Sequence, residues 1–211
     1  TSRTTTHNSP YVNHLAHFHL AAGCEFLVLG ALLGDYLKGP LDGTLPPALE
    51  RGVRLHRRID ALTDSDAALR LLRSHFTGGE RRLAGIVLDV FLDHLLTRHW
   101  ERFSATPLPV FAGEVCTTLV RHHQRLPVAA QQQATRITQH ELLQRYGDAA
   151  VVDGTLEHIG ERLGCSVQMR ATVARAWERL DAVEAAFLDC YPRLQTVAAT
   201  QEFRTNLSAG R

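Results

Sequence analysis

Apolar and polar positions alternate along most of the chain with the period of an α-helix. Apolar residues recur three to four positions apart, and proline and glycine separate the resulting segments. Neither an alternating run of β-branched residues nor an Asn-Gly turn is present, so no sheet is predicted. We therefore expect an all-α, single-domain helical bundle of about seven or eight helices. The predicted helices span 26–38, 47–62, 66–76, 81–103, 110–126, 137–146, 149–163 and 167–191.

The two ends of the chain depart from this pattern. Residues 1–10 are polar and lack the apolar stretch of a signal peptide, which predicts a disordered leader. Residues 11–198 are expected to form the single helical domain, and residues 199–211 a polar tail. No apolar run reaches the roughly 18 residues of a membrane span.

Charge and cysteine content narrow the class of protein further. The 23 Lys and Arg residues nearly balance 22 Asp and Glu, for a formal net charge of +1. Such a balance indicates neither a nucleic acid nor a membrane surface as partner. The four cysteines are scattered without a CxxC pair, as expected for reduced thiols in a cytoplasmic protein.

One strongly apolar predicted helix, 81–103, contains several polar residues. Asp89 and Asp93 are four positions apart, so both carboxylates lie on one helical face. His94 follows directly, and Arg98 lies on the next turn. Because a buried carboxylate needs a charged, hydrogen-bonding or metal partner, this helix is expected to face a polar site.

The N-terminal segments supply further candidates. Segment 11–22 carries His17 and His19, which share a face only if the segment is extended; a helix would instead pair Asn13 with His17. Asp35 is the only acid in segment 26–38 and lies near its C-terminal end, where a helix disfavours negative charge. A metal or an arginine would explain the position of Asp35, and so would a hydrogen bond at the loop entry.

The predicted helix 47–62 carries the clearest spacing. His56 and Asp60 are four positions apart on one face, with Arg57 and Arg58 between them. Mixed imidazole and carboxylate groups suit a divalent cation such as Mn²⁺, Mg²⁺, Fe²⁺ or Zn²⁺. A cation and arginines together indicate phosphoester hydrolysis, although a buried salt-bridge network would use the same residue types.

Five segments of the chain together form a recognisable pattern: NHLAHFHLA (13–21), GALLGDYLKG (30–39), GVRLHRRIDALTD (52–64), LDVFLDHLLTRHW (88–100) and CYPRL (190–194). These segments resemble the acyl carrier protein phosphodiesterase family and occur in the family's order. The resemblance implies an all-helical fold related, with altered connectivity, to the His/Asp metal-dependent phosphohydrolases. It also implies cleavage of the phosphodiester between 4′-phosphopantetheine and a serine of holo-acyl carrier protein, with Mn²⁺, or alternatively Mg²⁺, as the metal. His14 departs from the pattern, where an apolar residue is expected.

Residue roles follow from the resemblance together with the spacing. The residues predicted to be catalytic are Asp35, His56, Asp60, Asp93, Arg57 and Arg58. The predicted metal ligands are Asp35, His56, Asp60, Asp89, Asp93 and His94, and the predicted substrate-binding residues are His17, His19 and Arg98.

The expected partner is holo-acyl carrier protein, an acidic helical protein. The arginines of segments 51–58 and 70–82 are predicted to form a basic docking face for it, unless they are simply solvated. Two other functions stay open. One is a phosphohydrolase of a nucleotide or another small phosphodiester, and the other is a non-catalytic helical binding module held together by salt bridges.

Overall fold

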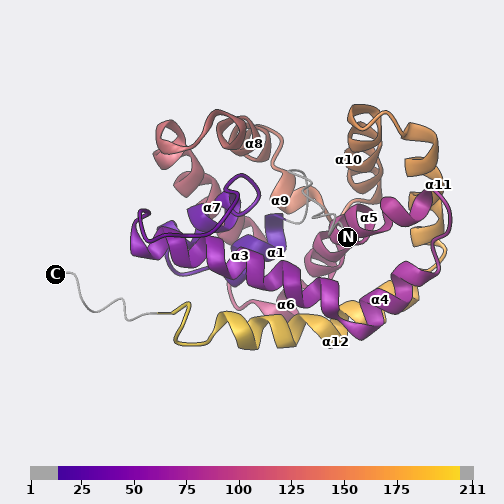
Figure 1. Ribbon diagram of the computed structural model, residues 1–211, viewed down its shortest axis with the longest axis horizontal. Helices are drawn as coiled ribbons and strands as arrows, with labels where there is room; N and C mark the ends of the chain where they lie inside the picture. The colour runs from indigo at the N-terminus through magenta and orange to yellow at the C-terminus, as the bar shows by residue number, and fades with distance from the viewer. Residues whose placement is uncertain (1–13, 205–211) are drawn as a thin grey trace.

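The computed structural model describes residues 14–204, and the architecture is all-α, as predicted (Figure 1). The described residues form twelve α-helical segments and two 3₁₀ turns, and no strand occurs among them. The predicted leader, residues 1–10, lies outside the described residues, as does most of the predicted tail. The elements are α1 (His14–Leu20), α2 (Glu25–Leu33), α3 (Pro47–Ser65), α4 (Ala67–Ser74), η1 (Glu80–Arg82), α5 (Ala84–Arg98), α6 (Trp100–Phe103), α7 (Leu108–His122), η2 (His123–Arg125), α8 (Val128–Gln139), α9 (Leu142–Arg145), α10 (Ala149–Arg162), α11 (Ser166–Trp177) and α12 (Leu180–Ala198).

Two predicted long helices are interrupted, which accounts for two of the four additional α-helical segments, and α1 and α8 are the other two. The predicted helix 81–103 breaks at His99, whose backbone leaves the helical region at φ −106° and ψ 19°. The break turns Trp100 into the core, where its indole N–H donates to the carbonyl of Thr106 at 2.7 Å. The predicted helix 167–191 likewise breaks between α11 and α12.

The predicted end of the last helix at Tyr191 and Pro192 was wrong, because α12 continues through Pro192 to Ala198. Proline inside a helix removes one backbone hydrogen bond and costs about 3 kcal/mol. Buried side chains on both sides of the proline, Tyr191 and Leu194, offset this cost by packing into the core.

Helix α2 is apolar on every side and packs very closely on α3. Every residue from Leu27 to Leu33 is buried. Two glycines make the approach possible: a Cβ at Gly30 would lie 2.2 Å from the carbonyl oxygen of Leu49 and 2.7 Å from the Cα of Gly52. This crossing fixes the end of α2, and the turn after it, against the middle of α3.

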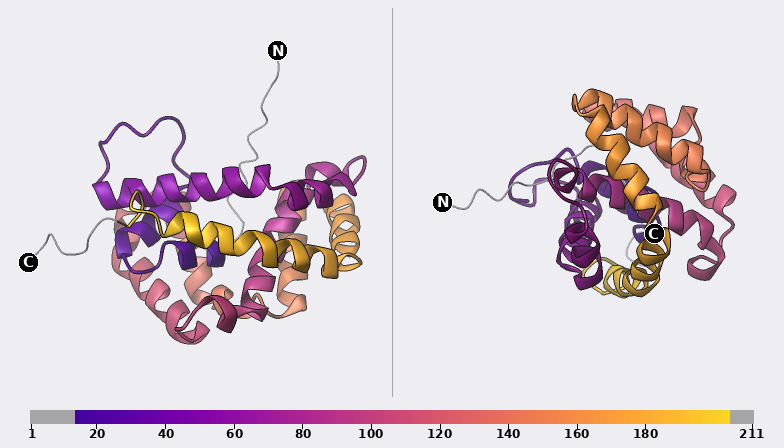
Figure 2. Two further views of the ribbon diagram at one scale, coloured as in Figure 1. Left: turned by 90° about the horizontal axis from the view of Figure 1, so that it is seen from below. Right: turned by 90° about the vertical axis from the view of Figure 1, so that its right-hand side faces the viewer.

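Several of the other helices pack around α5. α5, buried over most of its length, contacts α1, α10, α11 and α12. The α10–α11 pair forms one end of the molecule, and α7 and α8 lie toward the other (Figure 1). α12 runs back alongside α3 (Figure 2). Within the described residues, no helix combines the length and apolar character that a membrane crossing requires.

Candidate metal centre

Four of the predicted site residues come together beside α3. The Nε2 atoms of His17 and His56 each lie 3.2 Å from an oxygen of the Asp60 carboxylate. The Oδ1 atom of Asp35 lies 3.5 Å from the same Nε2 atom of His56. We call these four residues the His/Asp cluster. Its members come from α1, from the turn after α2 and from α3.

Local structure explains why these side chains meet. His56 and Asp60 are one turn apart on α3, so the predicted i, i+4 pairing is confirmed. α2 ends at Leu33, so Asp35 lies beyond the helix rather than within its last turn. Gly34 packs directly on the His56 ring, where no side chain would fit.

Charges inside the cluster shift the pKa values in opposite directions. Burial alone would lower the pKa of His56, but its contacts with Asp35 and Asp60 outweigh burial and raise it to about 10. Burial, followed by the nearby His56, lowers the pKa of His17. Burial opposes ionisation of Asp60, yet the two imidazoles prevail and lower its pKa. The cluster therefore keeps Asp60 ionised and leaves His17 a neutral imidazole, the form that ligates a metal.

The donor atoms of the cluster suit a divalent cation. Each of three residues, His17, His56 and Asp60, offers one ligand atom, and these three atoms lie within 4.8 Å of one another. The two imidazole rings stack at 4.0 Å with an angle of 18° between their planes, so both present an edge to Asp60. Among the described residues, His17 Nε2 is buried without any partner in hydrogen-bonding geometry. A buried unsatisfied nitrogen beside a carboxylate is what a metal ligand looks like without its metal.

Asp93 lies elsewhere, against the backbone of α1. Its Oδ2 atom accepts a hydrogen bond from the N–H of Leu15 at 3.0 Å, and its Oδ1 atom accepts one from Ala16 at 2.9 Å. The side chain is completely buried, and burial raises its pKa to about 7 although these two hydrogen bonds oppose the shift. The structure therefore does not bring Asp93 into the cluster.

The other two polar residues predicted on α5 have different surroundings. Asp89 is partly buried, and burial, followed by the negative charge of Asp60, raises its pKa well above the usual range. This places Asp89 near the cluster without direct contact. His94 points away, and its Nδ1 atom lies 2.8 Å from the carbonyl oxygen of Tyr146.

The predicted phosphate-binding arginines differ in their contacts. Arg57 donates to the carbonyl oxygens of Leu37 and Gly39, at 2.8 Å each, and so secures the loop that follows Asp35. Arg58 and Arg98 are exposed. Arg57 thus has a structural partner, whereas Arg58 is presented to solvent on the helix that carries the cluster.

His19 lies on the side of α1 away from the cluster. Its Nδ1 atom is 2.7 Å from the hydroxyl oxygen of Tyr191 on α12, and its ring packs against Trp100. Because α1 is helical, His17 and His19 point in different directions, which resolves the alternative that the sequence left open.

Sequence reasoning gave no role to His14, although it lies close to the cluster. The side chain is buried, and burial together with the nearby His17 and His56 lowers its pKa to about 4, although Asp35 opposes this shift. The sequence feature that could have pointed to His14 is its i, i+3 spacing to His17, which places both imidazoles on one face of α1.

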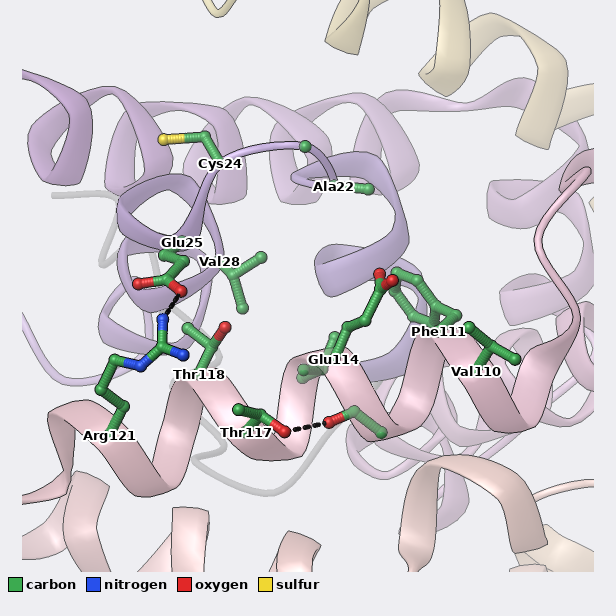
Figure 3. A pocket seen from close by; sticks show the side chains of 13 residues that line it. Ala22, Cys24, Glu25, Val28, Val110, Phe111, Glu114, Thr117, Thr118 and Arg121 are labelled. Atoms are coloured by element: carbon green, nitrogen blue, oxygen red, sulfur yellow. Dashed lines mark hydrogen bonds and ion pairs between the residues drawn. The ribbon is translucent and has the colours of Figure 1, made fainter. Parts of the chain in front are cut away.

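A separate pocket of about 580 Å³ lies between the α1–α2 turn and α7 (Figure 3). Ala22, Val28 and Phe111 line its apolar part, and Glu25 pairs with Arg121 at one end. No predicted site residue lines this pocket, so it is distinct from the His/Asp cluster.

An all-helical fold around a partly buried His/Asp cluster defines this chain as a helical protein with a candidate centre for a divalent cation. Comparison with known proteins then gives the family. The model of the family described as acyl carrier protein phosphodiesterase matches residues 12–194, so the chain belongs to the acyl carrier protein phosphodiesterase family.

Curated relatives agree with this assignment over nearly their whole length. The acyl carrier protein phosphodiesterase of Serratia proteamaculans is 31% identical over 192 residues, which cover 90% of this chain and all of the relative. The protein of that name from Escherichia coli O6:H1 is 33% identical over 89% of this chain and 98% of the relative. The one from Yersinia pestis is 29% identical over 89% of this chain and 97% of the relative. No solved structure matches the chain, so the expected relation to the His/Asp phosphohydrolases stays a prediction.

Proposed function

We propose that this chain hydrolyses the phosphodiester between 4′-phosphopantetheine and a serine of holo-acyl carrier protein. The products are apo-acyl carrier protein and 4′-phosphopantetheine. The observation that carries the proposal is the convergence of the ligand atoms of His17, His56 and Asp60 in a chain of this family. The four free cysteines fit a cytoplasmic enzyme.

The proposed ligands are His17, His56 and Asp60, with Asp35 beside them, and the proposed cation is Mn²⁺ or Mg²⁺. Two imidazoles favour Mn²⁺ over Mg²⁺, which prefers oxygen ligands. A cation held by these residues would polarise a phosphoryl oxygen and would favour ionisation of the attacking water. This set adds His17 to the predicted ligands and omits three of them. Asp89 has no direct contact with the cluster, and atoms of Asp93 and His94 are engaged by backbone groups.

The surroundings of the cluster fit a phosphate substrate approaching from solvent. The imidazoles of His17 and His56 are buried, whereas the Asp60 side chain is 49% exposed, so the cluster opens on the Asp60 side. The exposed Arg58 lies two positions from both His56 and Asp60 on α3, so its side chain leaves the helix on a different face from the cluster. Arg57 fixes the loop that carries Asp35.

An acidic carrier protein suits the arginine-lined hollow at the α3–α4 corner, which measures about 650 Å³. Arg70, Arg73 and Arg81 line this hollow. Asp64, on its edge, is one turn beyond Asp60 on α3 and pairs with Arg73 at 2.9 Å. We therefore propose that the carrier protein docks over this hollow, with its prosthetic group directed to the cluster. Such docking is expected to weaken as salt increases.

Mass spectrometry of holo-acyl carrier protein tests the proposal directly. With Mn²⁺, the purified chain is expected to convert holo- to apo-protein, and a chelator should stop the reaction. His56→Ala should abolish turnover, whereas His158→Ala, which removes a half-exposed histidine of α10, should leave turnover unchanged. Hydrolysis of small phosphodiesters or nucleotides but not of the carrier protein would support the second function. A folded, metal-free protein without turnover on either substrate class would favour the binding module.

A further inference from the structure

Helix α1 carries a cluster residue but is too short to hold its own position. It has only seven residues, and isolated helices of that length are not stable in water. The first four N–H groups of any helix also lack partners within the helix. The place of His17 must therefore be set by contacts from other parts of the chain.

Besides its buried apolar side chains, α1 has a polar attachment near each end. At the N-terminal end, both oxygens of Asp93 accept hydrogen bonds from the backbone of α1, at 3.0 and 2.9 Å. Near the C-terminal end, the Nδ1 atom of His19 lies 2.7 Å from the hydroxyl of Tyr191 on α12. His17 lies between these two attachment points.

We propose that Asp93 is a positioning residue, whose carboxylate fixes the first turn of α1 and thereby places the His17 imidazole against Asp60 and His56. A negative side chain at this end also complements the helix dipole. The importance of the placement rests on the proposed function, because it matters only if His17 ligates the cation.

The geometry distinguishes this role from that of a ligand and from ordinary capping. A ligand role would need a free carboxylate oxygen facing the cluster, but both Asp93 oxygens accept from backbone N–H groups. Ordinary capping is local, as at Asp66, whose Oδ1 atom accepts from Ala68 and Leu69 at 3.0 Å each. Asp93 instead reaches across 77 and 78 positions of sequence, so it joins α1 to α5.

The test compares Asp93→Ala and Asp93→Asn with the matched control Asp66→Ala, which removes a double acceptor away from the cluster. The first readout is amide hydrogen exchange. First-turn amides usually exchange fast, but those of Leu15 and Ala16 should be protected in the unaltered protein and exposed in both Asp93 variants. The second readout is the affinity for Mn²⁺ alone. It should fall about 10- to 100-fold in Asp93→Ala, less in Asp93→Asn, and stay unchanged in Asp66→Ala.

Each result decides the proposal. An unchanged Mn²⁺ affinity in both Asp93 variants overturns it, and so does an equal loss in Asp66→Ala, which would indicate a general loss of stability. If Asp93→Ala does not fold, Asp93→Asn carries the comparison. If the unaltered protein neither binds Mn²⁺ nor cleaves holo-carrier protein, the proposed function fails separately. The contact between the His17 and His56 rings, measured by NMR in the unaltered protein and in the Asp93 variants, then decides whether Asp93 positions His17.

Discussion

Gly34→Ala probes how tightly the turn after α2 is packed on the cluster. Gly34 has helical backbone angles, φ −53° and ψ −35°, so alanine causes no backbone strain. The added Cβ, however, would lie 2.2 Å from Cγ and 2.3 Å from Cδ2 of the His56 ring, where ordinary contact begins at 3.4 Å. The imidazole must therefore move by about 1 Å, a displacement that can cost roughly 10²-fold in rate.

Two opposing effects set the expected stability. Replacing a helical glycine with alanine gains about 0.5–1 kcal/mol, whereas overpacking a core position costs about 1–3 kcal/mol. We expect Gly34→Ala to lose about 1–2 kcal/mol in urea unfolding, since the His56 ring is buried and has little room to move. Mn²⁺ affinity and turnover should fall together, by roughly 10²-fold.

Gly154→Ala is the matched control, because Gly154 lies within α10 and a Cβ there has no neighbour within 4 Å. This variant should keep full Mn²⁺ affinity and gain slightly in stability. If Gly34→Ala equalled Gly154→Ala in stability, metal affinity and turnover, the packing argument for His56 would be wrong.

Three further predictions concern the cluster and its loop. Asp60→Asn should lower the pKa of His56 from about 10 toward the ordinary 6.5, which an NMR titration of the metal-free protein measures; an unshifted pKa would contradict the pairing. Because the folded-state pKa of His56 is raised, its contribution to the stability of the metal-free protein should be complete below pH 6.5 and lost as pH rises through about 10. Urea midpoints of the unaltered protein and His56→Gln should therefore converge at high pH. Arg57→Ala should loosen the loop through its lost contacts with two carbonyls and reduce Mn²⁺ affinity, whereas Arg58→Ala, on a different face of α3 from the cluster, should leave Mn²⁺ affinity unchanged; an equal loss of Mn²⁺ affinity in both variants would refute this division.

The sequence alone identified the part of the cluster that depends on local geometry. His56 and Asp60 share a face because any helix brings residues four positions apart together. Asp89 and Asp93 have the same i, i+4 spacing, but this spacing does not bring Asp93 into the cluster, because the partner of Asp93 is the backbone of α1. A hydrogen bond between side chain and backbone so far apart in sequence leaves no periodic signal, so local spacing could not distinguish a ligand from a positioning acid.

The same reasoning explains the misplaced end of α12. A proline after an aromatic residue is a reasonable local stop signal, because proline cannot donate a backbone hydrogen bond. In the structure the buried Tyr191 and Leu194 keep the helix going, and Arg193 adds an ion pair with Asp66 at 2.7 Å. Tertiary packing therefore overrides the local signal wherever the following turn is well buried.

The arrangement of the cluster implies that cation binding and the docking of α1 depend on each other. His56 and Asp60 share one rigid helix and pair without α1, whereas His17 joins them only when α1 is in place. A cation that uses all three residues therefore binds more tightly to the protein with α1 docked, and by linkage it must stabilise that docking by the same free energy. If the cluster binds a cation as proposed, the Nε2 atom of His17, which is buried without a partner in hydrogen-bonding geometry among the described residues, would gain one on binding. Together with the buried apolar side chains of α1, a carboxylate on α5 and a tyrosine on α12 hold this short helix in position without a cation.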